Sequence, residues 1–429
     1  MTLGFLLIVL FLLLIALRVP IAFCMLLTSF VYVLVAQKVP GTFIPQAMTS
    51  GSTSYLILSI PFFVLLGELM NTAGVTRRLF EFADNLVGHI TGGLGHVNVL
   101  ASVMFAGVSG SAAADAAGLG NVEIKAMKEK GFDADFAVGI TAASSTIGPI
   151  IPPSTPMVVF GILTGTSIGA LFLGGLLVGV LMAIFMMITV YIIARKRNYP
   201  KNEKPSSLRQ IWKSFREAFW ALLSPIILVG GILSGYFTPT EASAVSVVYA
   251  LFLGFVVYRE MTFKSLLGIF KYAIENIGMI MLLLAAGTVF TWMIGEQKVA
   301  EKTADFLFGF TDNALMLILL INLFLLFLGT FMETMAAMLI SVPVLMPIVF
   351  EMGMDPVQFG VIMVFNLMVG LLTPPMGICL FITSKIGGIS LERTVKAVSL
   401  YYIGLLLVLA LISLIPGITL WIPNLFYGS

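Results

Sequence analysis

The sequence predicts an all-α, polytopic membrane protein with an inverted repeat, in which each half holds a re-entrant helical hairpin and a broken helix. Three observations lead to this prediction. The 429 residues are 59% hydrophobic and only 10% charged, whereas soluble domains carry roughly 25% charged residues. Apolar segments of membrane-spanning length recur along the whole chain. A pattern of glycine, aspartate and proline residues occurs twice with constant spacing.

The composition also excludes several classes of protein. A net charge of +2 gives no sign of a nucleic-acid partner, because the basic residues lie in loops, where they set membrane orientation. Cys24 and Cys379 both lie in apolar segments, so neither a disulfide framework nor a cysteine metal site is expected. The first apolar segment, 3–17, has no positively charged start and no small-residue cleavage site, so we expect a retained helix.

The repeat has an offset of 222 residues, which separates Pro152-Pro153 from Pro374-Pro375. The same offset aligns further residues that break or cap helices, namely Gly107 with Gly329, Asp133 with Asp355, and Gly148 with Gly370. Such residues are rarer than apolar ones, so their matches are harder to obtain by chance. Each half therefore holds a hairpin followed by a helix broken at a Gly…Pro-Pro stretch. The two aspartates are expected to be helix N-caps.

The topology follows if 93–128 and 313–350 are re-entrant hairpins, because the remaining apolar segments then cross the membrane ten times. The two broken helices then run in opposite directions. Of the 23 lysine and arginine residues, 20 lie on one side, and 3 (Lys38, Lys298 and Lys302) lie on the other. The positive-inside rule assigns the first side, which includes the loop 195–217, to the cytoplasm. Both termini are then expected in the periplasm.

The broken helices point to ion and solute binding. Proline removes a backbone donor, and the residue before it is pushed away from helical angles. We therefore expect 148–153 and 370–375 to unwind within the membrane, where unwound backbone is tolerated only inside protein or beside a cavity. Unwound carbonyl groups suit a cation, and the N-termini of half-helices suit an anion.

The hairpin tips carry polar residues that complement these breaks. The first tip reads AGVSGSAAAD (106–115) and the second reads LGTFMET (328–334). We expect each tip to meet the broken helix of its own half, which gives two pseudo-symmetric cation sites near the midplane with a cleft between them. Na⁺ is the expected coupling ion because hydroxyl and carbonyl groups dominate, whereas Asp115 and Glu333 leave proton coupling open.

Alternatives remain for several residues. Paired prolines also occur as simple kinks, and small serines also serve close helix packing. Lys298 is either a solvated lysine or an anion ligand, and Glu68 and Asn71 are either interface residues or a subunit contact. The stretch 107–110 matches the GxSG of intramembrane serine proteases, but both histidines precede it, so no base lies in a later helix. We therefore expect the chain not to be an enzyme.

Four stretches carry a resemblance to one protein family: IPFFVLLGELMNTAG (60–74), FAGVSGSAAADAAGLG (105–120), STIGPIIPPSTPMVVFG (145–161) and GLLTPPMG (370–377). The chain resembles the large membrane subunit (DctM-like) of tripartite ATP-independent periplasmic (TRAP) transporters over essentially its whole length. The resemblance implies a secondary-active importer of the bacterial inner membrane, driven by Na⁺ with no other cofactor. It implies an organic-acid substrate such as a C4-dicarboxylate, a sialic acid or a sugar acid. Two partners are also implied: a small four-helix membrane subunit, expected as a separate chain, and a periplasmic solute-binding protein.

The resemblance further implies an elevator mechanism, in which a transport domain slides against a scaffold. The amphipathic stretches 77–92 and 301–313 are expected to lie near the interface as arm helices. The chain would then divide into scaffold helices (1–76), an arm (77–92), the first transport half (93–167), scaffold helices with a cytoplasmic loop (168–296, loop 195–217), a second arm (297–312), the second transport half (313–390) and a C-terminal scaffold helix (391–429). The alternative is a stand-alone Na⁺- or H⁺-coupled carboxylate or anion transporter of the same architecture.

Site residues follow from the same resemblance, position by position. One sodium site would combine the first tip and break, through Gly107, Ser109, Ser111, Ser144, Ser145 and Gly148. The other would combine the second tip and break, through Gly329, Thr330, Gly370 and Thr373. The substrate would lie between them, near Ser111, Asp115, Ser154, Thr155, Glu333, Pro374 and Gly377, with Lys298 as the nearest basic residue.

Overall fold

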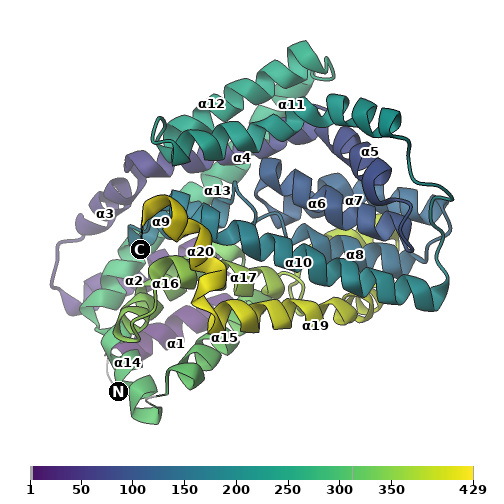
Figure 1. The fold of residues 1–429 in the computed structure, drawn as a ribbon. Coiled ribbons are helices and arrows are strands. Elements are labelled where there is room, and N and C mark those ends of the chain that lie inside the picture. Colours follow the sequence, from purple (N-terminus) through teal and green to yellow (C-terminus); the bar gives the residue numbers. More distant parts are fainter. Residues whose placement is uncertain (1–2, 312, 429) are drawn as a thin grey trace.

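The computed structural model describes residues 3–311 and 313–428, and every regular element in that part of the chain is helical (Figure 1). The first ten helices are α1 (Leu3–Ala16), α2 (Ile21–Ala36), α3 (Phe43–Ser52), α4 (Ser59–Thr72), α5 (Val75–Val87), α6 (Gly93–Ser109), α7 (Ala112–Glu129), α8 (Ala134–Ser145), α9 (Thr155–Thr164) and α10 (Ile168–Arg197). The others are α11 (Leu208–Leu233), α12 (Pro239–Phe252), α13 (Phe263–Glu296), α14 (Val299–Phe310), α15 (Ala314–Phe331), α16 (Thr334–Glu351), α17 (Pro356–Gly370), α18 (Ile378–Gly387), α19 (Leu391–Leu414) and α20 (Pro416–Tyr427).

Each half of the repeat contains a helical hairpin with a short connection. Helices α6 and α7 are joined at Gly110, whose φ of 63° is a left-handed conformation that glycine adopts at little cost. Ser111 then caps α7, because its hydroxyl accepts a hydrogen bond from the Ala114 amide. Helices α15 and α16 are joined at Met332 and Glu333, and the Glu333 carboxylate caps α16. The two hairpins therefore occupy the predicted positions in sequence.

Both predicted helix breaks are present. Helix α8 ends at Ser145 and α9 begins at Thr155, so residues 146–154 form no α-helix. Helix α17 ends at Gly370 and α18 begins at Ile378, so residues 371–377 are likewise unwound. The prolines in these stretches lack backbone donors, so the helical ladder cannot continue through them. The Pro152-Pro153 and Pro374-Pro375 peptide bonds are cis.

Eight helical segments among the described residues are long and apolar enough to span a membrane. They are Tyr55–Thr72, Ile168–Arg197, Leu208–Leu233, Pro239–Val257, Phe263–Glu296, Ala314–Phe331, Thr334–Glu351 and Leu391–Leu414. This set includes α15 and α16, which the sequence predicts to form a re-entrant hairpin, and it omits the shorter α1 and α2. The chain has the helices of a multi-pass membrane protein, and the count of ten crossings stays a prediction.

The helix contacts show which elements are neighbours across the predicted division. Helices α2, α3 and α4 pack on α13, and α12 packs on α4. Helices α10 and α19 run side by side (Figure 1). Helix α10 also packs on α20, α6 and α17, and α19 packs on α8 and α17. The sequence places α10 (in 168–296) and α19 (in 391–429) with the scaffold, and this division stays a prediction; both helices contact the broken helices directly. Both are long apolar helices, so their sequences do not show which partner they pack against.

The C-terminal segment 391–429, expected as one helix, forms two helices. Helix α19 ends at Leu414, and Ile415 has φ −121° and ψ 88°, outside the helical range. Pro416 causes this end, because it disfavours helical angles in the residue before it and supplies no amide donor. Pro416 is itself at the first position of α20, where its missing donor costs nothing.

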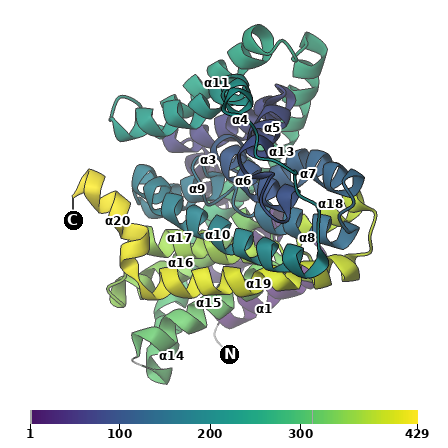
Figure 2. The same ribbon diagram turned by 45° about the vertical axis from the view of Figure 1, so that its right-hand side comes forward.

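Two short helices lie near the expected arms, at opposite ends of the molecule (Figures 1 and 2). Helix α5 begins after Gly74, which has a φ of 74°, and buries one face that includes Leu79 and Ala83. Helix α14 begins after Lys298. Residue 312, in the second predicted arm, lies outside the described residues, as do the chain ends in 1–76 and 391–429. The interfacial position of both helices stays a prediction.

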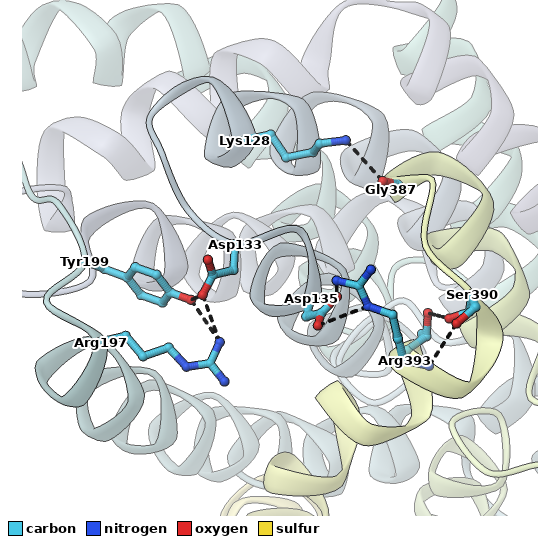
Figure 3. Close-up of polar contacts among 9 residues, drawn as sticks. Lys128, Asp133, Asp135, Arg197, Tyr199, Gly387, Ser390 and Arg393 are labelled. Atoms are coloured by element: carbon cyan, nitrogen blue, oxygen red, sulfur yellow. Dashed lines mark hydrogen bonds and ion pairs between the residues drawn. The ribbon is translucent and has the colours of Figure 1, made fainter.

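The two repeat-related aspartates differ in what they bind. Asp355 caps α17 as predicted, because its carboxylate accepts from the amides of Val357 (2.7 Å) and Gln358 (3.4 Å). Asp133 stands at the N-cap position of α8 but makes no capping hydrogen bond. Its carboxylate accepts instead from Arg197 Nη1 (3.1 Å) and from the Tyr199 hydroxyl (Figure 3). The expected cap at Asp133 is therefore wrong, because these donors at the end of α10 occupy the side chain.

Candidate functional site

The first tip lies directly against the first break. A Cβ atom on Gly110 would stand 2.5 Å from the Pro153 carbonyl oxygen. The Asp115 carboxylate lies against Gly148, where a Cβ atom would meet its Oδ2. The Ser109 hydroxyl donates a hydrogen bond to Asp115 Oδ1, whereas the buried Oδ2 has no hydrogen-bond partner. The structure therefore brings three residues of the predicted site, Ser109, Asp115 and Gly148, into one buried cluster.

The two serines at the end of α8 have different surroundings. The Ser144 hydroxyl donates to Asn98 Oδ1 on α6 at 2.7 Å. The Ser145 hydroxyl donates back to the carbonyl of Ala142 at 2.8 Å. Both side chains are fully buried. A hydroxyl keeps lone pairs when it donates, so either oxygen retains acceptor capacity for a cation.

The second tip and break pack even more closely through two glycines. A Cβ atom on Gly370 would stand 2.5 Å from the backbone Cα and carbonyl carbon of Gly329. The Met376 amide donates to the Thr330 carbonyl at 3.2 Å. Thr373 donates to the carbonyl of Val369 at 2.9 Å, as a hydroxyl at the end of α17 commonly does. Gly329, Thr330 and Gly370 of the second predicted sodium site thus belong to one tip–break contact, and Thr373 lies in the adjoining break.

A cavity of about 790 Å³ lies beside the first tip–break contact and extends to Glu333 of the second hairpin. Its walls include the first turn of α7, the start of α9, the N-cap of α16 and one face each of α4 and α13. Four predicted site residues line it, namely Ser109, Ser111, Thr155 and Glu333. The remaining polar lining residues are Glu68, Asn71, Thr76, Tyr272 and Asn276. No lysine, arginine or histidine is among the described lining residues.

Helix ends supply the positive potential that these side chains lack. The unpaired amides at a helix N-terminus attract anions. Glu333 already occupies the amides of α16, accepting from Met335 at 2.9 Å and Ala336 at 3.4 Å. Helices α7 and α9 are capped by the neutral Ser111 and Ser154. These two helix ends therefore leave the cavity wall able to receive a carboxylate.

Other residues of the predicted substrate site lie apart from this cavity. Ser154 is buried behind it, where its hydroxyl donates to the Pro149 carbonyl. Pro374 and Gly377 lie in the second break and do not line the cavity of about 790 Å³. Lys298 pairs with Glu301 at 2.9 Å and lines a different cavity of about 530 Å³. The structure therefore does not bring Lys298 together with the other predicted substrate residues.

The cavity also contains residues that the sequence did not single out. Tyr272 and Asn276 lie four residues apart on α13, so they occupy one helix face. Two polar side chains one turn apart in a long apolar helix are the sequence pattern that could have identified these residues as part of a site. Glu68 and Asn71, whose role was left open, line the same cavity from α4. They face α7 across it, because a Cβ atom on Gly118 would stand 2.5 Å from Asn71 Oδ1.

Comparisons with known proteins establish the family. The family model described as "Tripartite ATP-independent periplasmic transporter, DctM component" matches residues 8–418. The sialic acid TRAP transporter large permease protein SiaM of Vibrio cholerae is 46% identical over 409 residues, which cover 95% of this chain and 96% of that protein. The chain belongs to the large permease family of TRAP transporters. The resemblance read from the sequence motifs is thereby confirmed.

A longer relative and a solved structure are also similar to this large permease. The sialic acid TRAP transporter permease protein SiaT of Haemophilus influenzae is 43% identical over 87% of this chain and 60% of that protein. A crystal structure of the YdaH transporter of Alcanivorax borkumensis shares the fold, with a TM-score of 0.64 at 14% identity over 88% of each chain. The curated relatives are named as transporter permeases, so the large permease is a transport protein and not an enzyme.

Proposed function

We propose that this large permease imports an organic-acid anion across the bacterial inner membrane together with Na⁺. A periplasmic binding protein would deliver the anion, and a small membrane subunit, expected as a separate chain, would complete the transporter. Large permeases of this family work with such partners. The observation that carries the proposal is the cavity of about 790 Å³, onto which the N-termini of α7 and α9 open beside the first tip–break contact, and which Glu333 of the second hairpin also lines.

A sialic acid is the substrate that we favour within this class. Two relatives named for sialic acid are 46% and 43% identical, whereas a C4-dicarboxylate permease of Pseudomonas aeruginosa is 39% identical and a 2,3-diketo-L-gulonate permease of Escherichia coli is 37% identical. The cavity chemistry supports this choice. Its helix ends suit one carboxylate, and Glu68, Asn71 and Asn276 offer partners for hydroxyl and amide groups.

The two tip–break contacts support the Na⁺ coupling. Hard cations prefer oxygen ligands from carbonyl, hydroxyl and carboxylate groups. The first contact offers the Ser109 hydroxyl, the Asp115 carboxylate and the Ser145 carbonyl near Gly148, and the second offers the backbone of Gly329 and Gly370 with Thr373. The first contact lies next to the cavity that would hold the anion. Binding of the cations would therefore favour anion binding by direct electrostatic attraction.

The positions of the two cavities support an elevator movement. Thr76 and Tyr272, which line the larger cavity, are neighbours of Arg77 and Lys271 on the basic side of the chain. Lys298, which lines the smaller cavity, belongs to the opposite side. We propose that the hairpins and broken helices move together with α10 and α19, as their packing indicates. In this structure the substrate cavity would face the cytoplasm.

The test is uptake by reconstituted transporter. The large permease and its small subunit are placed in liposomes, and uptake of radiolabelled sialic acid is measured under an inward Na⁺ gradient, with and without the binding protein. Succinate serves as the comparison substrate. We expect uptake of sialic acid only when both the Na⁺ gradient and the binding protein are present.

Other results would contradict separate parts of the proposal. Uptake without the binding protein would favour the stand-alone carrier. Uptake that follows a pH gradient and ignores Na⁺ would refute the sodium coupling. Preference for succinate would keep the transporter assignment but refute the choice of a sialic acid.

A further inference from the structure

A second buried polar cluster lies deeper in the first half, away from the hairpin tip. Glu123 stands on α7 and is fully buried. Asn98 Nδ2, on α6, donates to Glu123 Oε2 at 2.5 Å and to Thr141 Oγ1, on α8, at 2.8 Å. The Ser144 hydroxyl donates to Asn98 Oδ1 from one turn further along α8. Three helices thus surround a single carboxylate with oxygen and amide groups.

The carboxylate of Glu123 lacks a counter-charge. The ion pairs of the described residues do not include it. Its Oε1 is buried and has no hydrogen-bond partner. An isolated carboxylate inside a protein is costly, and within a membrane such a group is retained for a partner or a function. A positive ligand at Oε1 would remove this cost.

The amide of Asn98 determines whether a cation can join this cluster. Its Nδ2 lies between two oxygens, Glu123 Oε2 and Thr141 Oγ1. Turning the amide by 180° would point Oδ1 toward Glu123 and Thr141, so that three oxygen ligands could converge on a cation, and Nδ2 would then donate to Ser144 Oγ. The Ser144 hydroxyl can accept this bond, because its own proton also has an acceptor in the Thr141 carbonyl at 3.3 Å. The turned amide would therefore lose no partner at Ser144.

We propose that Glu123, Asn98 and Thr141 form a third Na⁺ site, separate from the two tip–break sites. A carboxylate, an amide carbonyl and a hydroxyl are oxygen ligands of the kind that hard cations bind. One carboxylate balances one positive charge, which favours a monovalent ion. The site shares no ligand with the first tip, and Ser144 supports it only through Asn98. This inference extends the Na⁺ coupling proposed above.

The experiment counts bound Na⁺. The purified large permease with its small subunit is dialysed to equilibrium against ²²Na⁺, with choline chloride holding the ionic strength constant. We compare wild type with Glu123→Gln, which keeps the side-chain shape but removes the charge. Glu129→Gln is the matched control. Glu129 is the last residue of α7, and its exposed carboxylate is paired with Lys125. We expect Glu123→Gln to bind one Na⁺ fewer than both other proteins.

A second variant keeps the test decisive if Glu123→Gln does not fold. Thr141→Val removes one ligand and leaves the charge, so the affinity of one Na⁺ should fall roughly tenfold or more while the number bound at saturation stays the same. Equal counts in wild type and folded Glu123→Gln would overturn the third site, as would unchanged affinities in Thr141→Val. Wild type that binds no Na⁺ at all would refute the Na⁺ coupling itself, and the two failures are therefore distinguishable.

Discussion

At the residue scale, the second tip–break contact depends on the absence of two side chains. Gly329 and Gly370 approach so closely that a Cβ atom on either would meet backbone atoms of the other, at 3.1 Å and 2.5 Å. Backbone atoms cannot move aside as a flexible side chain can. The sequence identified both glycines through the repeat, and the structure supplies the steric reason. Carbonyl groups of the tip and the break can lie side by side only because neither residue has a Cβ atom.

This close approach predicts that Gly370→Ala damages both folding and transport. The added methyl group would push the second tip away from the break, and overpacking of this kind costs about 1–3 kcal/mol. Thermal unfolding of the purified protein should show a lower Tm, and Na⁺-driven uptake should be lost. Gly278→Ala is the control, because nothing lies within 4 Å of a Cβ atom at this α13 position. A variant with alanine at 370 and normal uptake would show that the tip–break contact is not needed.

At the element scale, the ends of α8, α10 and α19 are tied together by polar contacts (Figure 3). Arg393 forms an ion pair with Asp135, with Nη2 2.7 Å from Oδ1, and its Nε donates a hydrogen bond to Oδ2 at 3.4 Å. Tyr199 and Arg197 bind Asp133 in the same region. Burial, followed by the hydrogen bond to Asp133, raises the pKa of Tyr199 to about 12, so its hydroxyl stays a donor at neutral pH. These contacts explain why α10 and α19 accompany α8.

A double-mutant cycle on Asp135→Asn and Arg393→Gln measures one of these contacts. The side chains of Asp135 and Arg393 are 35% and 58% exposed, so solvent screening limits their coupling to about 0.5 kcal/mol. The coupling should shrink in high salt. The pair Glu392–Lys396 on the same helix is more exposed, and its cycle serves as the comparison. Equal coupling in both cycles would mean that the α8–α19 pair does not link these helices.

At the scale of the whole molecule, the cavity marks the boundary between two groups of helices. One wall comes from α4 and α13, and the other comes from the first hairpin and the starts of α9 and α16. The two hairpins and two broken helices were predictable, because glycine, proline and polar tip residues act locally on the backbone. The grouping of α10 and α19 was not, because helices of nearly uniform apolarity carry no pattern that names a partner. Tyr272 and Asn276 became site residues only because α13 packs against α4 and lines the same cavity as α7.

The elevator proposal predicts that tying the two groups together stops transport. Asn71 on α4 and Gly118 on α7 lie in contact across the cavity, so cysteines at both positions should form a disulfide within its geometric range. Oxidation should abolish Na⁺-driven uptake, and reduction should restore the level of the reduced variant. The native Cys24 and Cys379 are buried and should not interfere.

A matched pair inside the proposed moving group separates movement from general damage. Phe185 on α10 and Gly404 on α19 are close enough for a second disulfide, since a Cβ atom on Gly404 would stand 3.1 Å from Phe185 Cβ. Because both helices would travel together, oxidation of cysteines placed there should leave uptake unchanged. The 71–118 link joins parts that must slide past one another, whereas the 185–404 link joins parts that need not. Full uptake with the 71–118 link completely formed would therefore refute sliding at this boundary and confine alternating access to smaller movements of the hairpin tips.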